Sequence, residues 1–405
     1  MGSHEIIVIV GGGHAAAQLC AGLAEAGCGA RVHVICDEPH VPYHRPPLSK
    51  SFLKNEAETV QSLRPAAWYA EAGITVHGAD AAIAIDRPRK QVRLRSGATI
   101  AYGQLVLATG ARARPLPGLP ETLENLALLR SATDATRLRR LLGQAGKVTV
   151  LGGGFIGLEV AATAAALGKS VTVLEAAPRL LMRSVSTGLS AHVLETHRAA
   201  GIDVRLGVTA SAFDVQQDRL VSLTVDGQAE PVDLLLGGIG AAPEHSLAME
   251  AGLPCDNGIL VDACLRTVDP AILAIGDCAN FPEHGTGRRL RLESVQNAND
   301  QARTAVATLL GREDPYRALP WFWSEQGAMR LQMAGLLPPG ATTHRRPGAA
   351  PASFSLLHYD GDRLACVESV NAPMDHLAAR KLLEAGRSPA PATACDPATP
   401  LKSLI

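Results

Sequence analysis

Two glycine-rich loops constrain the fold of this 405-residue chain more than any other feature. Each follows a short β-branched run, at 5–10 and 147–151, and each opens an Ala-rich segment with helical character. The loops read Gly11-Gly12-Gly13-His14-Ala15-Ala16 and Gly152-Gly153-Gly154-Phe155-Ile156-Gly157. A second β-branched run follows each helical segment, at 31–36 and 170–174. The spacing Gly-x-Gly-x-x-Gly/Ala between a strand and a helix predicts a parallel βαβ unit, and the chain contains two of them.

The two loops predict two dinucleotide sites. Glycines let the backbone approach a pyrophosphate at a helix N-terminus, where free N–H groups favour an anion. An acid that can accept hydrogen bonds from ribose hydroxyls ends each second strand, Asp37 or Glu38 in the first unit and Glu175 in the second. An acid at 175 favours NADH over NADPH, although Arg179 and Arg183 just beyond it could accept a phosphate. We therefore expect FAD at the first loop and NAD(H) at the second.

Two further strand ends support the binding of a flavin near the first glycine loop. The run 105–110 ends in Thr109-Gly110, and the run 272–278 contains Gly276-Asp277. An Asp at the carboxyl end of a parallel strand lies where ligands bind, and it can hold a hydroxyl of the flavin's sugar chain. The alternative role for Asp277 is to cap the next helix.

Composition excludes several classes of protein. A net charge of −1 gives no global basic field for nucleic acid, and no run reaches the roughly 20 apolar residues of a membrane span. The first residues carry no basic region ahead of an apolar segment, so we expect no signal peptide and a cytoplasmic location. The eight cysteines form neither a Cys-x-x-Cys pair nor a zinc spacing, so we expect reduced thiols and no bound metal.

Three longer strings, in colinear order with the glycine loops, carry a resemblance to a known family. They are RPPLSK at 45–50, ESVQNA at 293–298 and PWFWSEQ at 320–326. The chain resembles the NADH-dependent ferredoxin reductases that serve Rieske-type aromatic-ring oxygenases and bacterial cytochrome P-450 systems, in the glutathione reductase superfamily. The resemblance implies an α/β fold with two Rossmann-like, three-layer ββα domains and a C-terminal α+β domain. It places a discontinuous FAD-binding domain at 1–112 and 242–318, the NAD-binding domain at 113–241 and an interface domain at 319–405. Two departures are Ala16, where many relatives have Gly, and Glu244, where relatives often have an amide.

The resemblance also implies a reaction and roles for three residues. Hydride passes from NADH to flavin N5, and the flavin then gives single electrons to a 2Fe-2S ferredoxin that feeds the oxygenase. Lys50 is expected near the N5 edge, where an ammonium stabilises negative charge on the reduced ring. Glu159 is expected near the nicotinamide carboxamide and paired with Lys50, and Trp323 against the isoalloxazine on the side away from NADH. The plainer alternatives are a surface lysine, an acid on the first helical turn that favours the helix dipole, and a core anchor, the last being favoured for Phe322.

The remaining candidate site residues complete two sets. The residues expected to bind FAD are Gly11, Gly13, His14, Ala15, Ala16, Asp37, Arg45, Lys50, Ala82, Ala108, Thr109, Gly110, Arg130, Gly276, Asp277, Val295 and Trp323. Those expected to bind NAD are Gly152, Gly154, Phe155, Ile156, Gly157, Glu159, Glu175, Arg183 and Gly240.

The same residues leave other functions open and indicate how an electron acceptor would dock. An NADH oxidase or quinone reductase and a flavin-dependent redox sensor or interaction protein remain alternatives. A dithiol mechanism is rejected because 39–50 and 151–175 contain no Cys, and such a mechanism needs a thiolate and a resolving Cys. An acidic ferredoxin is expected to dock on local basic clusters, with a solvated surface as the alternative. The clusters are Arg288, Arg289 and Arg291, and Arg330 with Arg345 and Arg346.

Overall fold

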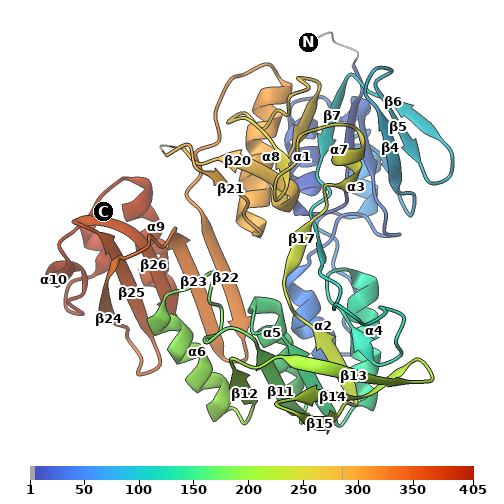
Figure 1. The fold of residues 1–405 in the computed structure, drawn as a ribbon. Helices are drawn as coiled ribbons and strands as arrows, with labels where there is room; N and C mark the ends of the chain where they lie inside the picture. The colour runs from blue at the N-terminus through green and yellow to red at the C-terminus, as the bar shows by residue number, and fades with distance from the viewer. Residues whose placement is uncertain (1–4, 285) are drawn as a thin grey trace. The chain divides into compact units, whose positions relative to one another are not determined.

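The computed structural model describes residues 5–284 and 286–405, which divide into two compact units (Figure 1). The first unit contains the chain up to 44, 60–112 and 241–318, and the second contains 45–59, 113–240 and 319–405. The divisions near 112, 240 and 318 lie within one residue of the predicted domain boundaries. Residues 45–59 were expected in the FAD-binding domain but pack in the second unit, because their two short helices lie against helices of the 113–240 segment.

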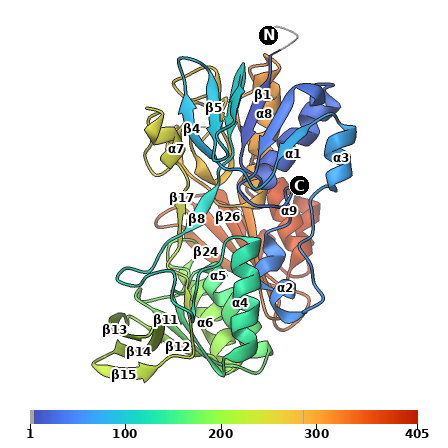
Figure 2. The ribbon, with the colours of Figure 1, turned by 90° about the vertical axis from the view of Figure 1, so that its right-hand side faces the viewer.

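A five-stranded parallel sheet forms the centre of the first unit. Its strand order is β19-β7-β1-β2-β3. These strands are β19 (Ile272–Ala274), β7 (Gln104–Leu107), β1 (Ile7–Val10), β2 (Val32–Ile35) and β3 (Thr75–His77). The core strand β1 and residues 105–107 of β7 are apolar and buried, as expected for a parallel sheet covered on both faces. The helices α1 (His14–Glu25) and α8 (Val295–Leu309) lie side by side in Figures 1 and 2, and both pack into this core.

Smaller elements complete the first unit. An antiparallel meander is formed by β4 (Ala82–Asp86), β5 (Gln91–Leu94) and β6 (Thr99–Ala101). The paired strands β8 (Ala111–Ala113) and β17 (Ala241–Pro243) carry the chain out of this unit and back into it. The others are η1 (Gly29–Arg31), α3 (Ala66–Glu71), α7 (Ser246–Glu250), β18 (Ile259–Leu260), η3 (Gly276–Cys278), β20 (Ala279–Pro282) and β21 (Arg289–Leu290).

The second unit repeats this plan and adds a second sheet. Its parallel sheet has the order β12-β11-β10-β16-β9, made of β12 (Asp203–Leu206), β11 (Ser170–Glu175), β10 (Lys147–Leu151), β16 (Leu234–Gly237) and β9 (Leu126–Ala127). A meander follows, made of β13 (Ala210–Gln216), β14 (Arg219–Val225) and β15 (Gln228–Pro231). The helices of this segment are α4 (Ala132–Gln144), α5 (Phe155–Ala166) and α6 (Thr187–Ala199). The 45–59 segment supplies η2 (Pro46–Ser49) and α2 (Ser51–Lys54), and Figure 2 shows α2 beside α4.

The C-terminal part of the second unit is an antiparallel sheet with helices. The order is β22-β23-β26-β25-β24, made of β22 (Trp321–Gln326), β23 (Met329–Gly335), β26 (Arg363–Val370), β25 (Phe354–Asp360) and β24 (Thr342–Pro347). The helix α9 (Pro373–Glu384) buries Ala378, Ala379 and Leu382 against this sheet. Two short helices, α10 (Pro391–Ala394) and η4 (Leu401–Leu404), close the chain. The α/β class with a C-terminal α+β part, expected from the sequence, is confirmed.

Among residues 5–284 and 286–405, no helix combines the length and the apolar character needed to cross a membrane. The same residues contain no group of three or more His, Cys, Asp or Glu side chains placed to hold a metal ion.

Candidate functional site

The first glycine loop lies tightly against the end of a neighbouring strand. Gly11 has a φ of +123°, and an ideal Cβ on it would lie 2.1 Å from the carbonyl oxygen of Ala108. Its N–H donates to the carbonyl of Ile35 at 2.9 Å, so the turn is tied to β2 as well. Because both the conformation and the space exclude a side chain, the backbone alone forms this surface.

The helices that follow the two glycine loops begin without a side-chain cap. The helices α4, α6 and α8 start after Ser131, Ser186 and Ser294, and each serine accepts a hydrogen bond from the first turn. By contrast, α1 and α5 start after Gly13 and Gly154, and neither has a side-chain cap or an acid in its first turn. Their first N–H groups are left for an anion, which is what the phosphates of a dinucleotide require. The two loops therefore fit the two cofactors that the sequence predicts.

Other predicted FAD residues gather around the first loop. Residues 108–110 follow β7, whose neighbour in the sheet is β1, and Thr109 Oγ1 donates to the carbonyl of Glu244 at 2.5 Å. The Gly276 N–H donates to Gln301 Oε1 at 2.7 Å, and an ideal Cβ on Gly276 would lie 3.3 Å from that of Ala15. Asp277 lies within η3, whereas Ser294 caps α8, so the alternative role of Asp277 as a helix cap is not observed.

The acids near the first loop have partners within their own unit. Asp37 accepts a hydrogen bond from Arg95 at 2.8 Å, and both side chains are more than half exposed. Glu38 accepts one from the Tyr43 hydroxyl at 2.7 Å. Glu244, which departs from the family pattern, accepts a hydrogen bond from Ser246 and lies 3.8 Å from the Arg112 side chain. Among the other candidates, His14 begins α1 and is buried, Ala82 begins β4 and Val295 begins α8.

The second glycine loop opens onto a pocket of about 760 Å³. Gly152 has a φ of +107°, and an ideal Cβ on it would lie 2.4 Å from the carbonyl oxygen of Gly238. Of the predicted NAD residues, Gly152, Gly154, Phe155, Glu175, Arg183 and Gly240 line the pocket. Ile156, Gly157 and Glu159 lie on α5 outside the lining. The sequence did not single out Gly238, which follows β16 as Gly152 follows β10, or Phe213, which comes from the β13–β14 hairpin. The strand-then-glycine pattern could have identified Gly238, but no local signal marks Phe213.

Glu175 is already held against the second loop. Its Oε2 accepts from the Gly153 N–H at 2.5 Å, and its Oε1 accepts from the Ala177 N–H at 2.7 Å. Arg179 donates to the carbonyls of Met182 and Val185 at 2.7 and 2.9 Å, so it braces the loop before α6. Arg183 is exposed at the pocket wall. Of the two arginines that could accept a phosphate, Arg179 is therefore engaged with the chain's own backbone.

Lys50 and Glu159, both in the second unit, form the ion pair that the resemblance implied. Lys50 Nζ lies 2.6 Å from Glu159 Oε2, and the Ser49 hydroxyl donates to the same oxygen at 2.5 Å. Ser324 Oγ donates to Oε1 at 2.7 Å. Glu159 was expected on the first turn of its helix. That expectation is wrong, because α5 begins at Phe155 and places the buried Glu159 one turn further in.

The strand β22 places its aromatic residues on alternating sides, as predicted. The Trp321 and Trp323 rings lie 5.6 Å apart, whereas Phe322 packs on Phe155 at 4.6 Å. Phe322 thus anchors the C-terminal sheet to the start of α5. Elsewhere in this unit, Arg45 donates to the carbonyl of Arg130 at 2.8 Å, which brings these two FAD candidates together.

The eight cysteines are all free thiols. Burial raises the pKa of Cys20, Cys278 and Cys366, and also that of Cys255, Cys264 and Cys395. A dithiol mechanism needs the opposite, a thiol with a lowered pKa. These six thiols are therefore poorly suited to such a mechanism.

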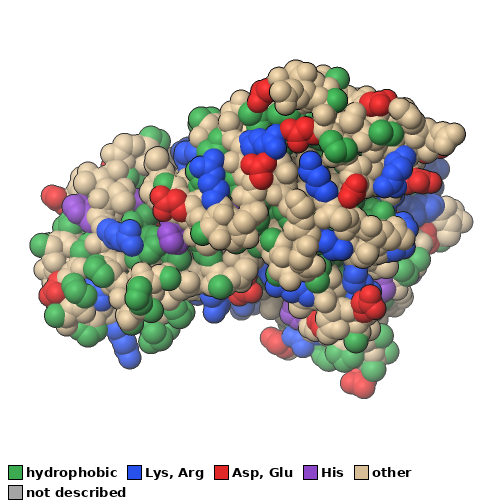
Figure 3. All heavy atoms as spheres, turned by 90° about the horizontal axis from the view of Figure 1, so that it is seen from below, with side chains coloured by type: hydrophobic (Ala, Val, Ile, Leu, Met, Phe, Trp, Pro, Cys, Tyr) green, Lys and Arg blue, Asp and Glu red, His purple; other side chains and the backbone are tan. Residues whose placement is uncertain are grey.

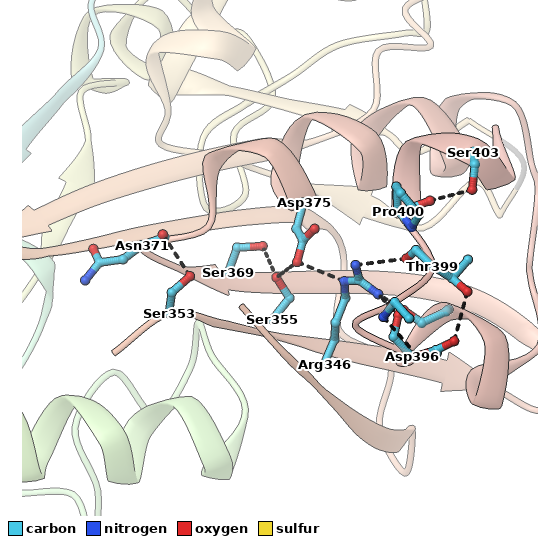
Figure 4. Close-up of polar contacts among 12 residues, drawn as sticks. Arg346, Ser353, Ser355, Ser369, Asn371, Asp375, Asp396, Thr399, Pro400 and Ser403 are labelled. Atoms are coloured by element: carbon cyan, nitrogen blue, oxygen red, sulfur yellow. Dashed lines mark hydrogen bonds and ion pairs between the residues drawn. The ribbon is translucent and has the colours of Figure 1, made fainter. Parts of the chain in front are cut away.

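The two predicted basic clusters contain both exposed arginines and arginines that bind the chain's own backbone. On the face in Figure 3, basic and acidic side chains are interspersed, as the low net charge predicts. Arg289 donates to the carbonyls of Val261 and Asn280, and Arg291 is nearly buried, 2.7 Å from Glu293. Arg346 is 5% exposed and binds Asp375 and the carbonyls of Ala394, Asp396 and Thr399 (Figure 4). Arg291 and Arg346 are therefore engaged within the fold and are not available to dock a partner. Arg288, Arg289, Arg330 and Arg345 are exposed, and docking on them stays a prediction.

Comparison with known proteins agrees with this architecture. Residues 6–302 match the pyridine nucleotide-disulphide oxidoreductase family, and residues 321–405 match the reductase C-terminal family. The chain is 42% identical to rhodocoxin reductase of Rhodococcus erythropolis, covering 98% of this chain and 94% of that protein. It is 39% identical to the ferredoxin–NAD(+) reductase component of the anthranilate 1,2-dioxygenase system of Burkholderia cepacia, with 100% of both covered. The ferredoxin reductase of the CYP199A2 system from Rhodopseudomonas palustris superposes with a TM-score of 0.95 at 41% identity, covering 98% and 99% of the two chains.

Enzymes of this family contain FAD and use NAD(H). The chain is an oxidoreductase that belongs to the pyridine nucleotide-disulphide oxidoreductase family and ends in a reductase C-terminal domain.

Proposed function

We propose that this chain is a cytoplasmic NADH:ferredoxin oxidoreductase that supplies a 2Fe-2S ferredoxin serving a Rieske oxygenase or a cytochrome P-450. The observation that carries the proposal is the pair of glycine loops. The second loop opens onto a pocket lined by Glu175, whose carboxylate accepts a hydrogen bond from the Gly153 N–H of that loop. The names of the relatives, which include ferredoxin reductases of a dioxygenase system and of a CYP199A2 system, support the choice of acceptor. When bound, FAD supplies hydride acceptance at N5 and the release of single electrons.

We assign residues to the two cofactors as proposals. The residues proposed to hold FAD are Gly11, Gly13, His14, Ala15, Ala16, Asp37, Arg45, Lys50, Ala82, Ala108, Thr109, Gly110, Arg130, Gly276, Asp277, Val295 and Trp323. NAD(H) would be held by Gly152, Gly154, Phe155, Ile156, Gly157, Glu159, Glu175, Arg183 and Gly240. The division into an FAD-binding, an NAD-binding and a C-terminal interface domain is part of the same proposal.

The charged pair is proposed to serve the hydride step. Lys50 Nζ lies 2.6 Å from the carboxylate of Glu159, and the Lys50 side chain retains 19% exposure while that of Glu159 has 5%. A hydrogen-bonded carboxylate fixes the direction of an ammonium group. We propose that this ammonium stabilises negative charge on the reduced flavin and that Trp323 covers the ring on the side away from NADH.

Steady-state turnover with different acceptors tests the proposed function. A purified 2Fe-2S ferredoxin should be reduced much faster than oxygen or a soluble quinone when NADH is the donor. Faster reduction of oxygen or quinone would instead indicate an NADH oxidase or quinone reductase. Slow turnover with every acceptor would indicate a redox sensor.

The exposed arginines provide a finer test of the ferredoxin partner. Arg288→Glu and Arg330→Glu should each raise the apparent KM for ferredoxin a few-fold, because steering by exposed charges acts on encounter rate. Added salt should have the same effect in the unmodified protein, and ferricyanide reduction should stay unchanged. Equal losses with dye and ferredoxin would mean that the substitutions damaged the fold, and no loss with either would place docking elsewhere.

A further inference from the structure

A chain of hydrogen bonds among buried side chains runs from α6 through β22 to Glu159. His197 Nε2 lies 2.8 Å from Gln326 Oε1, Gln326 Nε2 donates to Ser324 Oγ at 3.2 Å, and Ser324 Oγ donates to Glu159 Oε1 at 2.7 Å. All four residues are buried, each at most 4% exposed as a whole residue. These residues come from three elements far apart in sequence, and all belong to the second unit.

The hydrogen bonds of this chain all point toward the carboxylate. The amide oxygen of Gln326 can only accept a hydrogen bond, so His197 Nε2 carries the hydrogen and donates it. The Ser324 hydroxyl in turn donates a hydrogen bond to Glu159. Burial lowers the pKa of His197, which keeps its imidazole neutral. Donors aligned in this way polarise one another inside a protein and strengthen the final bond.

The two oxygens of Glu159 are held from different directions. Oε2 accepts from Ser49 and Lys50, both in the 45–59 segment, and Oε1 accepts from Ser324 of the C-terminal sheet. Lys50 is the charged group in contact with Glu159, and His197 is the titratable group behind Ser324 and Gln326. Losing the Ser324 hydroxyl would leave Oε1 buried without this donor, and the carboxylate would be free to turn away from Lys50.

Because side chains alternate along β22, Ser324 and Gln326 lie on the same face of the strand. Residues 322, 324 and 326 contact Phe155, Glu159 and His197 in turn, whereas Trp321 and Trp323 lie on the other face. Apolar side chains at 324 and 326 could fill the same space without burying polar groups. Two buried polar residues on the face of β22 that contacts Glu159 therefore point to a role beyond packing.

We propose that Ser324, Gln326 and His197 are positioning residues that fix the carboxylate of Glu159 and, through it, the ammonium of Lys50. The proposal rests on the proposed function, in which Lys50 serves the reduced flavin. It predicts a graded series, because each residue is one bond further from the carboxylate than the last.

The first test measures anaerobic reduction of the bound flavin by NADH in the holoenzyme. Ser324→Ala should slow reduction roughly tenfold, as expected for the loss of a hydrogen bond to a charged group. Gln326→Met should have a smaller effect and His197→Phe the smallest, while Ser324→Thr, which keeps the hydroxyl, should restore most of the rate. The matched control is Ser355→Ala. Ser355 is a fully buried serine of the same sheet whose partners are Ser369 and the Asp375 carboxylate, not Glu159, so this variant should be reduced at the rate of the unmodified protein.

The second test measures the lysine directly in protein freed of FAD. Acetic anhydride should acetylate Lys50, read by peptide mass spectrometry, several-fold faster in Ser324→Ala than in the unmodified protein or in Ser355→Ala. Glu159→Gln sets the upper limit of this rate. If Ser324→Ala does not fold, Gln326→Met decides by the same measurement.

These readouts separate failure of the positioning proposal from failure of the proposed function. Unchanged acetylation and unchanged flavin reduction in both Ser324→Ala and Gln326→Met would overturn the positioning proposal. Equal effects in Ser324→Ala and the Ser355→Ala control would also overturn it. A Lys50→Met variant whose flavin is reduced at the normal rate would contradict the proposed role of Lys50, while faster acetylation of Lys50 in Ser324→Ala would still support the positioning proposal.

Discussion

The two glycine loops have the same backbone shape but differ at the third small position. Gly11 and Gly152 have φ values of +123° and +107°, and each meets a carbonyl oxygen of the strand end beside it. At Gly157 an ideal Cβ would lie 2.5 Å from the Gly152 oxygen and 3.2 Å from a Val150 methyl, whereas the first loop carries Ala16 with its methyl in the core. The second loop therefore has no room for a Cβ at its third small position, so only glycine fits there. The first loop has room for the methyl group of Ala16 at the same position.

The acids differ more than the glycines. Asp37 lies at the surface and pairs with Arg95, whereas Glu175 accepts two backbone N–H groups of its own loop region. The backbone of the second loop region thus orients the Glu175 carboxylate, whereas no such contact holds Asp37 among the hydrogen bonds described for it. The comparison predicts that coenzyme choice is concentrated in one residue of the second loop, while FAD retention is spread over several residues.

The largest expected effects come from the first glycine of each loop. Gly11→Ala should give colourless protein, and Gly152→Ala should stay yellow but resist reduction by NADH, each with a loss on the order of 100-fold in affinity, because a Cβ would collide with backbone. FAD content and anaerobic reduction by NADH measure both. Gly78→Ala and Gly143→Ala are the matched controls, since a Cβ at either position meets nothing within 4 Å. Identical losses in both loop variants would show that the loops do not serve separate ligands.

Substitution of the third small position should have a larger effect in the second loop than in the first. Gly157→Ala should destabilise the second unit by about 2–3 kcal/mol and weaken NADH binding, since overpacking against backbone cannot relax easily. Ala16→Gly should cost only about 1 kcal/mol and leave FAD bound. Thermal unfolding together with an NADH titration distinguishes the two. A harmless Gly157→Ala would mean that the close approach at this loop is not required.

Coenzyme choice should depend on Glu175. Glu175→Ala should reduce the ratio of kcat/KM for NADH to that for NADPH. The corresponding free-energy difference is about 1–3 kcal/mol, the value of a few hydrogen bonds to a charged group. The same ratio should be unaffected in Asp37→Ala, which serves as the control from the other loop. A ratio that does not move in Glu175→Ala would remove this residue from the ribose site.

A smaller effect is expected at the strand end of the first unit. Asp277→Ala should weaken FAD retention by about 1–2 kcal/mol while NADH binding stays close to normal, because only the flavin's sugar chain is assigned to this carboxylate. Dilution followed by gel filtration, with FAD measured in the protein fraction, provides the comparison. Retention equal to that of the unmodified protein would contradict the assignment.

Much of this organisation could be predicted from the sequence because its signals are local. The strand at 147–151 and the alternation of Trp321 and Trp323 follow from short-range patterns, and both are present in the structure. The start of α5 at Phe155 was missed because the glycine loop itself begins the helix. The positions of Arg291 and Arg346 were missed for another reason. Their acceptors are carbonyls that only the folded chain brings near, so a run of charges in sequence cannot show which guanidinium is exposed.

The central claim, that one chain holds two dinucleotides and passes electrons from one to a ferredoxin, is tested most directly by an anaerobic titration. Purified protein should contain about one FAD per chain and lose its yellow colour on addition of about one equivalent of NADH. Oxidised 2Fe-2S ferredoxin added next should restore the colour as the ferredoxin becomes reduced. A protein that cannot be loaded with FAD, or one whose flavin stays oxidised in excess NADH, would contradict the account.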